Sequence, residues 1–240
     1  LEAAKAKYPN AKAFESFQEM FETMGDQIDM VTVSTPDHAH FPAAMEAIKR
    51  GKHVCVQKPL VNRIWEANQL HEAAKKKGVK TNMGNQGHTG EQIRQLKEWM
   101  GAGIVGNVKE IHVWTNRPIW PQGPIGKKLT ATPEGFDWDL WLGVEPSEPY
   151  FELDIADEKA LKRGRSVHPF NWRGWWQFGS GALGDMGCHI MDATFSILGQ
   201  VIPTKIEAES SPISALNAPQ WSNLVYHMPA SAKQQAMTVT

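Results

Sequence analysis

Short apolar segments alternate with helix-forming segments through the first 85 residues, and this alternation limits the possible folds most strongly. The predicted strands are 28–35 (IDMVTVST), 53–57 (HVCVQ) and 79–83 (VKTNM), and the predicted helices between them are 41–50 and 66–77. Single helices between short strands are typical of right-handed βαβ crossovers in a parallel sheet. Because the first of these strands is apolar on both faces, we expect helices to cover the sheet on both sides.

Local signals mark where these elements begin and end. Ser16 and Glu19 form an S-x-x-E capping box, which predicts the start of a helix. Gly51 and Gly78 follow the two later helices, where glycine commonly ends a helix. The segment 11–14 (AKAF) predicts a further short strand ahead of the capping box.

The pattern changes from residue 86 onward. A helix is predicted over 90–100, followed by a long strand of period two over 107–116. About 55 residues rich in Pro, Gly and Trp come next, and a structureless loop of that length inside a domain tends to be functional. One helix is then predicted over 181–199, ended by Gly199, and strands follow at 202–210 and in SNLVYHMP.

These patterns predict an α/β protein with two domains. Residues 1–85 would be the C-terminal part of a Rossmann-type domain with a partial parallel sheet. Residues 86–240 would form an α+β domain with a mostly antiparallel open sheet. The chain begins in a predicted helix without methionine and ends in a predicted strand, so we expect both domains to be incomplete pieces of a longer protein.

Composition argues against several classes of function. The formal net charge is −1, with both signs mixed along the chain, which gives no electrostatic basis for binding nucleic acid or an anionic membrane. No apolar run approaches the ~20 residues of a membrane-spanning helix. The two cysteines form neither a disulfide framework nor a spaced metal motif, so no metal site is expected.

Two predicted strands end in the same way, with a polar residue directly before a proline. These ends read VSTPDHAH, which contains Thr35 and Pro36, and VQKPL, which contains Lys58 and Pro59. Proline keeps the preceding residue extended, so Thr35 and Lys58 should project beyond the sheet, where parallel sheets bind ligands. The alternative is that the prolines only stop the strands and Lys58 is solvated.

A third candidate lies in the predicted late helix, at GDMGCHIMD. Asp185 and His189 are four residues apart and share one face, with Asp192 close to the same line. A carboxylate beside an imidazole can hold its tautomer and stabilise the protonated ring. A surface ion pair is the alternative. Four glycines weaken this helix, which indicates close approach of a ligand or another backbone, and they are Gly179, Gly181, Gly184 and Gly187.

Taken together, TPDHAH, GKHVCVQKPL, GNVKEIHVW and GALGDMGCHIMD occur in the order and spacing of one protein family. The chain resembles the glucose–fructose oxidoreductase/inositol dehydrogenase (Gfo/Idh/MocA) family of nicotinamide-dependent sugar dehydrogenases. The resemblance covers essentially all 240 residues, and it implies that the chain is truncated at both ends relative to the family. It implies that Lys58 contacts the reacting hydroxyl near the nicotinamide, and that Asp185 orients His189, the general base.

The resemblance also implies a cofactor site, and residue chemistry suggests sugar contacts. The residues expected to line an NAD or NADP cofactor are Ser34, Thr35, Pro36, His40, Gln57, Lys58, Pro59 and Asn85. Aromatic faces stack on sugar rings and arginine holds hydroxyls or a carboxylate, which suggests substrate contacts at His88, His168, Trp172 and Arg173. Ordinary packing or surface charge is the alternative for each of these four.

Two departures from the family pattern bear on the cofactor. Gln57 stands where the family has the glutamate of its Glu-Lys-Pro motif, which removes a negative charge beside Lys58. The family's G-x-G-x-x-G turn would precede Leu1, and the glycines at 179–187 follow no suitable strand. We therefore expect this polypeptide to bind nicotinamide nucleotides weakly or not at all without the missing portion.

The predicted function is hydride transfer between a nicotinamide cofactor and a sugar or polyol hydroxyl. One alternative is an NAD-assisted glycosidase acting by oxidation and elimination, and another is a non-catalytic fragment that only oligomerises. A metal-dependent amidohydrolase, suggested by H-x-H at 38–40, conflicts with a βα alternation that ends after three helix crossovers. The expected partners are a small sugar or polyol and further copies of the chain, as a dimer or tetramer through the second-domain sheet. The cellular compartment stays open between cytoplasm and periplasm.

Overall fold

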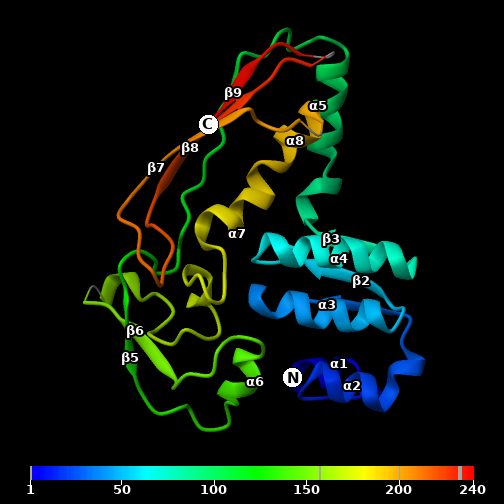
Figure 1. Ribbon diagram of the computed structural model, residues 1–240, viewed down its shortest axis with the longest axis vertical. Helices are drawn as coiled ribbons and strands as arrows, with labels where there is room; N and C mark the ends of the chain where they lie inside the picture. Colours follow the sequence, from blue (N-terminus) through cyan, green and yellow to red (C-terminus); the bar gives the residue numbers. More distant parts are fainter. Residues whose placement is uncertain (1, 157, 200, 232–233) are drawn as a thin grey trace.

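The structure, a computed structural model, describes residues 2–156, 158–199, 201–231 and 234–240. The first region contains three parallel strands in the order β1-β2-β3, with Val31 opposite Val54 and Val54 opposite Thr81 (Figure 1). Its elements are α1 (Glu2–Lys7), α2 (Phe17–Met24), η1 (Gly25–Gln27), β1 (Met30–Val33), η2 (Asp37–Ala39), α3 (His40–Lys49), β2 (His53–Gln57), α4 (Ile64–Lys77) and β3 (Thr81–Gly84).

Helices α3 and α4 pack on one face of this sheet. Val54 and Val56 of β2 are buried against Ala47 of α3 and Leu70 of α4, whereas Cys55 between them is only partly buried. This alternation follows from the period of two in a strand. On β1, Met30 is 59% exposed. The expectation that helices cover both faces is therefore wrong for the described residues, and the apolar run of β1 is buried mainly on one side.

Of the sequence features predicted near the ends of elements, the helix start at Ser16 and the helix end at Gly78 are confirmed, and the short strand over 11–14 is wrong. The Ser16 hydroxyl accepts a hydrogen bond from the Glu19 backbone N–H at 3.1 Å, which confirms the helix start. Gly78 ends α4 with φ +66°, a conformation that suits glycine. The segment 11–14 is not a strand, because no neighbouring strand of the described chain pairs with it.

The second region is α+β. Its elements are η3 (Gln86–Thr89), α5 (Glu91–Gly101), β4 (Glu110–Ile111), β5 (Gly126–Leu129), α6 (Trp138–Leu142), β6 (Phe151–Asp154), η4 (Glu158–Ala160), η5 (Asn171–Gly174), α7 (Gly181–Ile190), α8 (Asp192–Leu198), β7 (Lys205–Ser210), β8 (Ser222–Met228) and β9 (Met237–Val239). One sheet has the order β4-β9-β8-β7 and is antiparallel except between β4 and β9. The predicted fold class, a partial Rossmann-type sheet followed by an α+β part, is confirmed.

Two predicted elements of this region are corrected. The long strand over 107–116 shrinks to Glu110–Ile111, because only this part pairs regularly with β9. The single helix over 181–199 is two helices, α7 and α8, interrupted at Met191. Gly199 ends the second helix with φ +77°, as predicted.

The Trp-rich segment is not a structureless loop. Its buried side chains form an aromatic unit, defined here as residues 118–156 and 158–178, around the hairpin of β5 and β6. Trp138 stacks on Trp141 with ring centroids 5.0 Å apart, and Trp175 packs on Phe151 at 4.9 Å. Large rings therefore form a second core in a segment that has little regular secondary structure.

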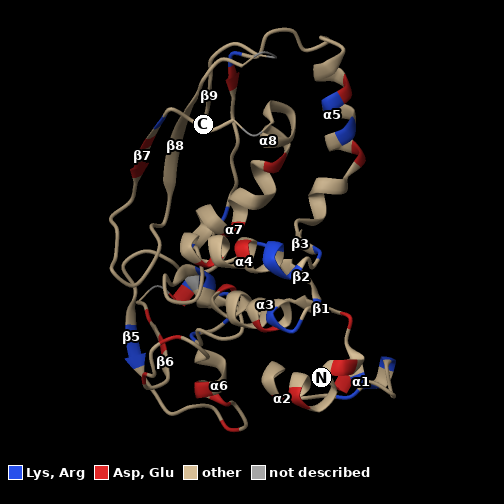
Figure 2. Ribbon diagram, turned by 45° about the vertical axis from the view of Figure 1, so that its right-hand side comes forward, with Lys and Arg blue, Asp and Glu red and all other residues tan. Residues whose placement is uncertain are grey.

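The charge distribution and the hydropathy of the helices do not change this description of the fold. Helix α5 carries both signs of charge along its length (Figure 2). Among the described helices, none is long and apolar enough to cross a membrane.

Candidate functional site

The carboxyl ends of the three parallel strands face helix α7 of the second region (Figure 1). At least one polar contact from the end of each strand crosses this boundary. The backbone N–H of His38, after β1, donates to the carbonyl of Phe178 at 3.2 Å. The side chain of Asn85, after β3, donates to the carbonyl of Cys188 at 2.7 Å. The third contact comes from Lys58, which follows β2.

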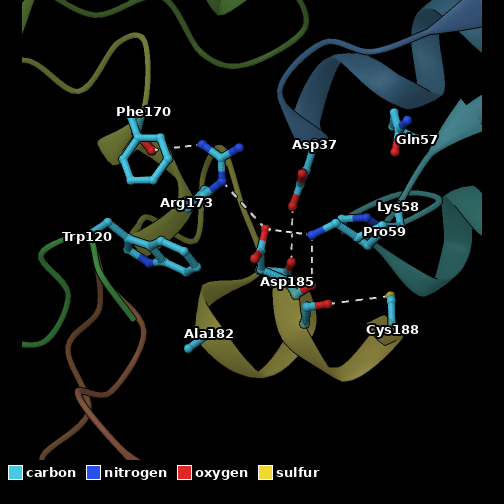
Figure 3. Close-up of polar contacts among 12 residues, drawn as sticks. Asp37, Gln57, Lys58, Pro59, Trp120, Phe170, Arg173, Ala182, Asp185 and Cys188 are labelled. Atoms are coloured by element: carbon cyan, nitrogen blue, oxygen red, sulfur yellow. Dashed lines mark hydrogen bonds and ion pairs between the residues drawn. The ribbon is translucent and has the colours of Figure 1, made fainter. Parts of the chain in front are cut away.

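Lys58 and Asp185 form the centre of the site (Figure 3). The Lys58 ammonium lies 3.0 Å from Oδ1 of Asp185 and donates to the backbone carbonyl of the same residue at 2.8 Å. Both side chains are largely buried, so this ion pair is screened less than a surface pair. Residues 127 positions apart thus converge, and one of the three ammonium N–H groups is left for a ligand.

Arg173 approaches the same carboxylate oxygen from the aromatic unit. Its Nε lies 3.5 Å from Oδ1 of Asp185, and its Nη1 donates to the carbonyl of Phe170 at 3.2 Å. The guanidinium packs over the rings of Trp172 at 4.3 Å and Phe170 at 4.5 Å. Burial lowers the pKa of Arg173, and the nearby Asp185 partly offsets this.

His189 lies one turn after Asp185 on α7 and is exposed. Burial of part of the ring and the positive charge of Lys58 lower its pKa, while Asp185 acts in the opposite direction. The imidazole is therefore neutral near pH 7 and able to accept a proton. Among the described contacts Asp185 does not hydrogen-bond His189. Its carboxylate is bound to Lys58 and Arg173, so its direct effect on His189 is electrostatic.

Asp37 completes the cluster from the end of β1. The residue is 2% exposed, and its carboxyl group accepts a hydrogen bond from the Ser180 hydroxyl at 3.0 Å. Burial raises the pKa of Asp37 to about 7, and the neighbouring carboxylate of Asp185 adds to this. Sequence reasoning missed Asp37, although its position directly after Pro36 at a strand end was a usable signal.

His40 is a correction to the predicted cofactor contacts. Its Nδ1 lies 2.8 Å from the carbonyl of Pro59 and its Nε2 lies 2.9 Å from the carbonyl of Thr35. Burial lowers the pKa of His40, and a neutral imidazole has one N–H, so it donates to one carbonyl at a time. The ring is buried and joins the loops that follow β1 and β2. It positions these loops and does not present a face to a cofactor.

Two predicted substrate contacts, at Trp172 and His168, are packed against other side chains of the chain. Trp172 is 5% exposed in the aromatic core, and its indole N–H donates to the carbonyl of Pro169 at 3.0 Å, so it supports Arg173 and offers no free face. His168 stacks on Phe136 with centroids 4.5 Å apart, and burial lowers its pKa. The sequence alone does not distinguish a ring that is packed inside the protein from a ring that contacts a ligand.

The other predicted positions lie along the strand edge. Ser34 and Thr35 are exposed after β1, whereas Pro36 is partly buried and Pro59 is buried. The Gln57 side chain accepts a hydrogen bond from Gln86 at 2.9 Å. His88 lies 2.8 Å from Asp192 and joins the segment after β3 to α8.

The glycines near α7 allow close backbone packing. A Cβ on Gly179 would lie 2.8 Å from both the Cα and the carbonyl oxygen of Arg173. Gly181 has φ +63° and its missing Cβ would overlap Ala218. A Cβ on Gly187 would meet nothing within 4 Å. The expected close approach is thus to other parts of this chain at Gly179 and Gly181.

A hollow of about 550 Å³ lies behind α7, between this helix and β8. Its lining includes Leu183, Gly187 and Trp221 but none of Lys58, Asp185 and His189. The hollow therefore lies on a different face of α7 from the polar cluster. No group of three potential metal-ligating side chains occurs among the described residues.

The strand edge fits the nicotinamide end of a dinucleotide. Oδ1 of Asn85 is buried without a partner, and the Ser34 and Thr35 hydroxyls enter no hydrogen bond described in the structure. An unpaired buried acceptor after β3 and exposed hydroxyls after β1 suit a carboxamide and a ribose bound along the same edge of the sheet. When bound there, the cofactor would lie beside Lys58. The glycine-rich turn that holds a pyrophosphate is not among these residues.

Comparison with known proteins gives a consistent result over nearly the whole chain. Residues 1–85 match the family described as "Oxidoreductase family, NAD-binding Rossmann fold". Residues 89–233 match "Oxidoreductase family, C-terminal alpha/beta domain".

Individual relatives are distant. An uncharacterized oxidoreductase of Schizosaccharomyces pombe, C115.03, is 23% identical over 238 residues, which are 98% of this chain and 52% of the yeast protein. The scyllo-inositol 2-dehydrogenase (NADP(+)) IolW of Bacillus subtilis is 28% identical over 116 residues, 48% of this chain and 32% of IolW.

Among solved structures, the WlbA dehydrogenase from Bordetella pertussis in complex with NADH and UDP-GlcNAcA superposes with a TM-score of 0.66 at 18% identity. The match covers 99% of this chain and 59% of the Bordetella protein, and at this identity it shows the fold. The chain thus spans about half the length of the yeast and Bordetella proteins.

Proposed function

We propose that this chain, which belongs to the Gfo/Idh/MocA family of oxidoreductases, supports hydride transfer between a nicotinamide nucleotide and a sugar or polyol hydroxyl. Its first 85 residues belong to the family's NAD-binding Rossmann domain. The observation that carries the proposal is the ion pair of Lys58 and Asp185 at the carboxyl edge of the parallel sheet, with the exposed His189 one helical turn after Asp185 on α7. The similarity to IolW, named as an inositol dehydrogenase, supports a polyhydroxylated substrate.

Each of the three side chains has a distinct task. The third N–H of the Lys58 ammonium stabilises negative charge on the substrate oxygen as its proton leaves. The neutral imidazole of His189 accepts that proton at a ring nitrogen. Asp185 holds Lys58 in place and compensates its charge. The bound nicotinamide supplies the hydride acceptor or donor.

The test measures nicotinamide reduction with a panel of sugars and polyols, with NAD⁺ and NADP⁺ in parallel. Two proteins are compared: the 240-residue chain, and the chain together with the residues that flank it in its gene. We expect turnover in the second protein and weak cofactor binding in the first, because the 240 residues include no glycine-rich turn that could bind the pyrophosphate.

Replacement of the central lysine provides the decisive variant. Lys58→Ala should lower kcat/KM by about 10²–10³-fold, as loss of an oxyanion donor does in other enzymes. Lys49→Ala, at the exposed end of α3, is the matched control and should leave kcat/KM unchanged. Equal activity of the two variants would contradict the proposed role of Lys58. Glycoside cleavage without net nicotinamide reduction would point to the oxidation–elimination alternative.

Self-association through the four-stranded sheet remains a prediction. Ile206 lies on the edge strand β7 and is 53% exposed, and an apolar side chain on an open edge supports pairing with another copy. Light scattering measures the oligomeric state. Ile206→Lys should shift a dimer or tetramer toward monomer, and a monomer before the substitution would refute the prediction.

A further inference from the structure

The hollow between α7 and β8 is lined by three exposed tryptophans. Its volume of about 550 Å³ lies within the range of about 300–1,000 Å³ that is usual for small-molecule pockets. Trp114 is 80% exposed, Trp221 is 48% exposed and Trp176 is 43% exposed. In the part of the chain that the structure describes, none of these three indoles stacks on another ring or lies under a cation. Their apolar faces are therefore available to a ligand.

Polar groups with unused hydrogen-bonding capacity line the same hollow. The Arg117 guanidinium is partly buried, and it forms no hydrogen bond or ion pair among the described residues. The side-chain amide of Asn223 and the hydroxyl of Tyr226 also enter no hydrogen bond that the structure describes. A ligand with hydroxyl groups would supply the missing partners, whereas a purely apolar ligand would cover these groups and leave them unpaired.

The charge of the lining does not favour a multiply charged ligand. Among the described residues that line the hollow, Arg117 is the one lysine or arginine, and no aspartate or glutamate occurs. The hollow thus combines apolar rings with mostly neutral hydrogen-bonding groups. This combination matches a sugar ring, which has apolar C–H faces and a rim of hydroxyls that both donate and accept.

Gly187 gives an independent indication of a ligand. It lies within α7 and lines the hollow, and a Cβ at this position would meet nothing within 4 Å. Glycine inside a helix is destabilising relative to alanine, and no close contact within the described chain requires it here. Close approach of a bound molecule to the helix backbone would account for a glycine at this position.

One wall of the hollow is held rigidly by Gln122, which is 5% exposed. Its side-chain oxygen accepts hydrogen bonds from the Trp120 indole N–H at 2.9 Å and from the Ala182 backbone N–H at 3.2 Å. Its side-chain nitrogen donates to the carbonyl of Pro219. These bonds join the start of α7 to two other segments, so the hollow is formed before a ligand arrives and binding needs little ordering of the protein.

We propose that this hollow is a carbohydrate-binding site, in which a sugar ring stacks on an exposed indole while its hydroxyls bind Arg117, Asn223 and Tyr226. The site goes beyond the proposed dehydrogenase function and does not depend on it, because the polar cluster around Lys58 lies on a different face of α7. One helix thus separates the reaction centre from a second sugar site.

The test uses saturation-transfer difference NMR and isothermal titration calorimetry, without cofactor, on the chain together with the residues that flank it in its gene. The probes are methyl β-D-glucopyranoside, methyl β-D-galactopyranoside and cellobiose, and D-sorbitol is the matched control because it has hydroxyls but no ring face. We expect at least one ring sugar to bind about fivefold or more tightly than D-sorbitol. Equal affinity for all four probes, or no binding of any of them, would overturn the proposal.

Variants assign the binding to the hollow. Trp114→Ala should weaken it about three- to tenfold through loss of ring stacking. Trp99→Ala, at a ring that is 45% exposed on α5 and outside the hollow, is the matched control and should leave affinity unchanged. Gly187→Leu fills the hollow from α7 and should weaken binding tenfold or more, with circular dichroism to show that the helix is retained. Unchanged affinity in both Trp114→Ala and Gly187→Leu would refute the site.

Further outcomes separate this site from the reaction centre and from other occupants of the hollow. Lys58→Ala should leave the binding unchanged, and loss of binding in Lys58→Ala but not in Trp114→Ala would assign the sugar to the reaction centre instead. A dimer that Trp114→Ala converts to monomer, with no probe bound before the substitution, would show that a second copy covers the hollow. Sugar binding in the hollow without any hydride transfer would overturn the dehydrogenase function alone.

Discussion

The two cores of this protein are built in different ways. The core under the parallel sheet consists of small and branched side chains such as Ala44, Ala47 and Val54, placed by regular strands and helices. The aromatic unit is filled by large rings such as Trp175 and Phe178, on a backbone with few regular elements. Backbone hydrogen bonding dominates the architecture of the first core, and side-chain shape dominates the second.

This difference extends to the candidate site, where each core supplies one side. The sheet delivers Lys58 because strand β2 ends there, in a position that any parallel sheet would produce. The aromatic unit delivers Arg173 because rings on either side hold its guanidinium. The sheet side should therefore tolerate changes in core packing better than the aromatic side.

The largest expected effect tests this contrast directly. Trp175→Ala, at a fully buried ring against Phe151, should lower the free energy of unfolding by about 3–5 kcal/mol through the cavity it leaves. Val54→Ala in the sheet core should cost about 2 kcal/mol, since it removes two methyl groups and leaves a smaller cavity.

Urea denaturation followed by circular dichroism measures both losses. Trp176→Ala, next in sequence and 43% exposed, is the control and should cost much less than Trp175→Ala. If Val54→Ala proves as costly as Trp175→Ala, the two cores are equally sensitive and the contrast fails.

The next effect concerns Asp37, at the boundary between the regions. Burial raises its pKa to about 7 from about 4 in an unfolded chain, so the folded protein favours the protonated carboxyl. Its contribution to stability is complete below about pH 4 and is lost as the pH rises through about 7, a change on the order of 4 kcal/mol.

Asp37→Asn keeps an acceptor for Ser180 and removes this titration. The wild type should thus lose stability relative to Asp37→Asn between pH 5 and pH 8, as measured by urea denaturation at both values. Parallel pH profiles for the two proteins would show that Asp37 is not forced toward its neutral form, and that the boundary is more polar than its burial indicates.

The smallest effect sharpens the comparison inside α7 and the turn before it. Gly179→Ala places a methyl group against the Arg173 backbone and should cost about 1–3 kcal/mol by overpacking. Gly187→Ala meets nothing within 4 Å and should stabilise the helix by about 0.5–1 kcal/mol. Thermal denaturation measures both changes. An equal response at the two positions would mean that the aromatic side does not constrain the backbone at Gly179.

Sequence reasoning succeeded where local periodicity carries the information. The strands β2 and β3 and the helices α3 and α4 were predicted close to their observed bounds, because apolar spacing and helix-ending glycines are local signals. It failed for the predicted strand 107–116, which has the right alternation but little partner to pair with. A strand needs a neighbour, and a neighbour is a tertiary property.

Prediction of the site residues was also limited to positions that carry a local sequence signal. Lys58 and Asp185 were found because each follows a local signal, a proline at a strand end and a helix-face pattern. His40 was assigned to the cofactor and Trp172 to the substrate, yet both are buried in internal contacts. Asp37 was missed, because its burial and its contact with Ser180 depend on side chains that are distant in sequence.

The amino-acid sequence alone determined the parallel sheet, the edge at which its strands end and the lysine at that edge, since hydrogen-bonding periodicity and proline geometry act over a few residues. Only the tertiary structure decided that Asp185 lies between Lys58 and Arg173 and that Asp37 is buried next to Ser180 at the same boundary. The charge and burial of a side chain depend on groups brought together through space, and no local pattern records them.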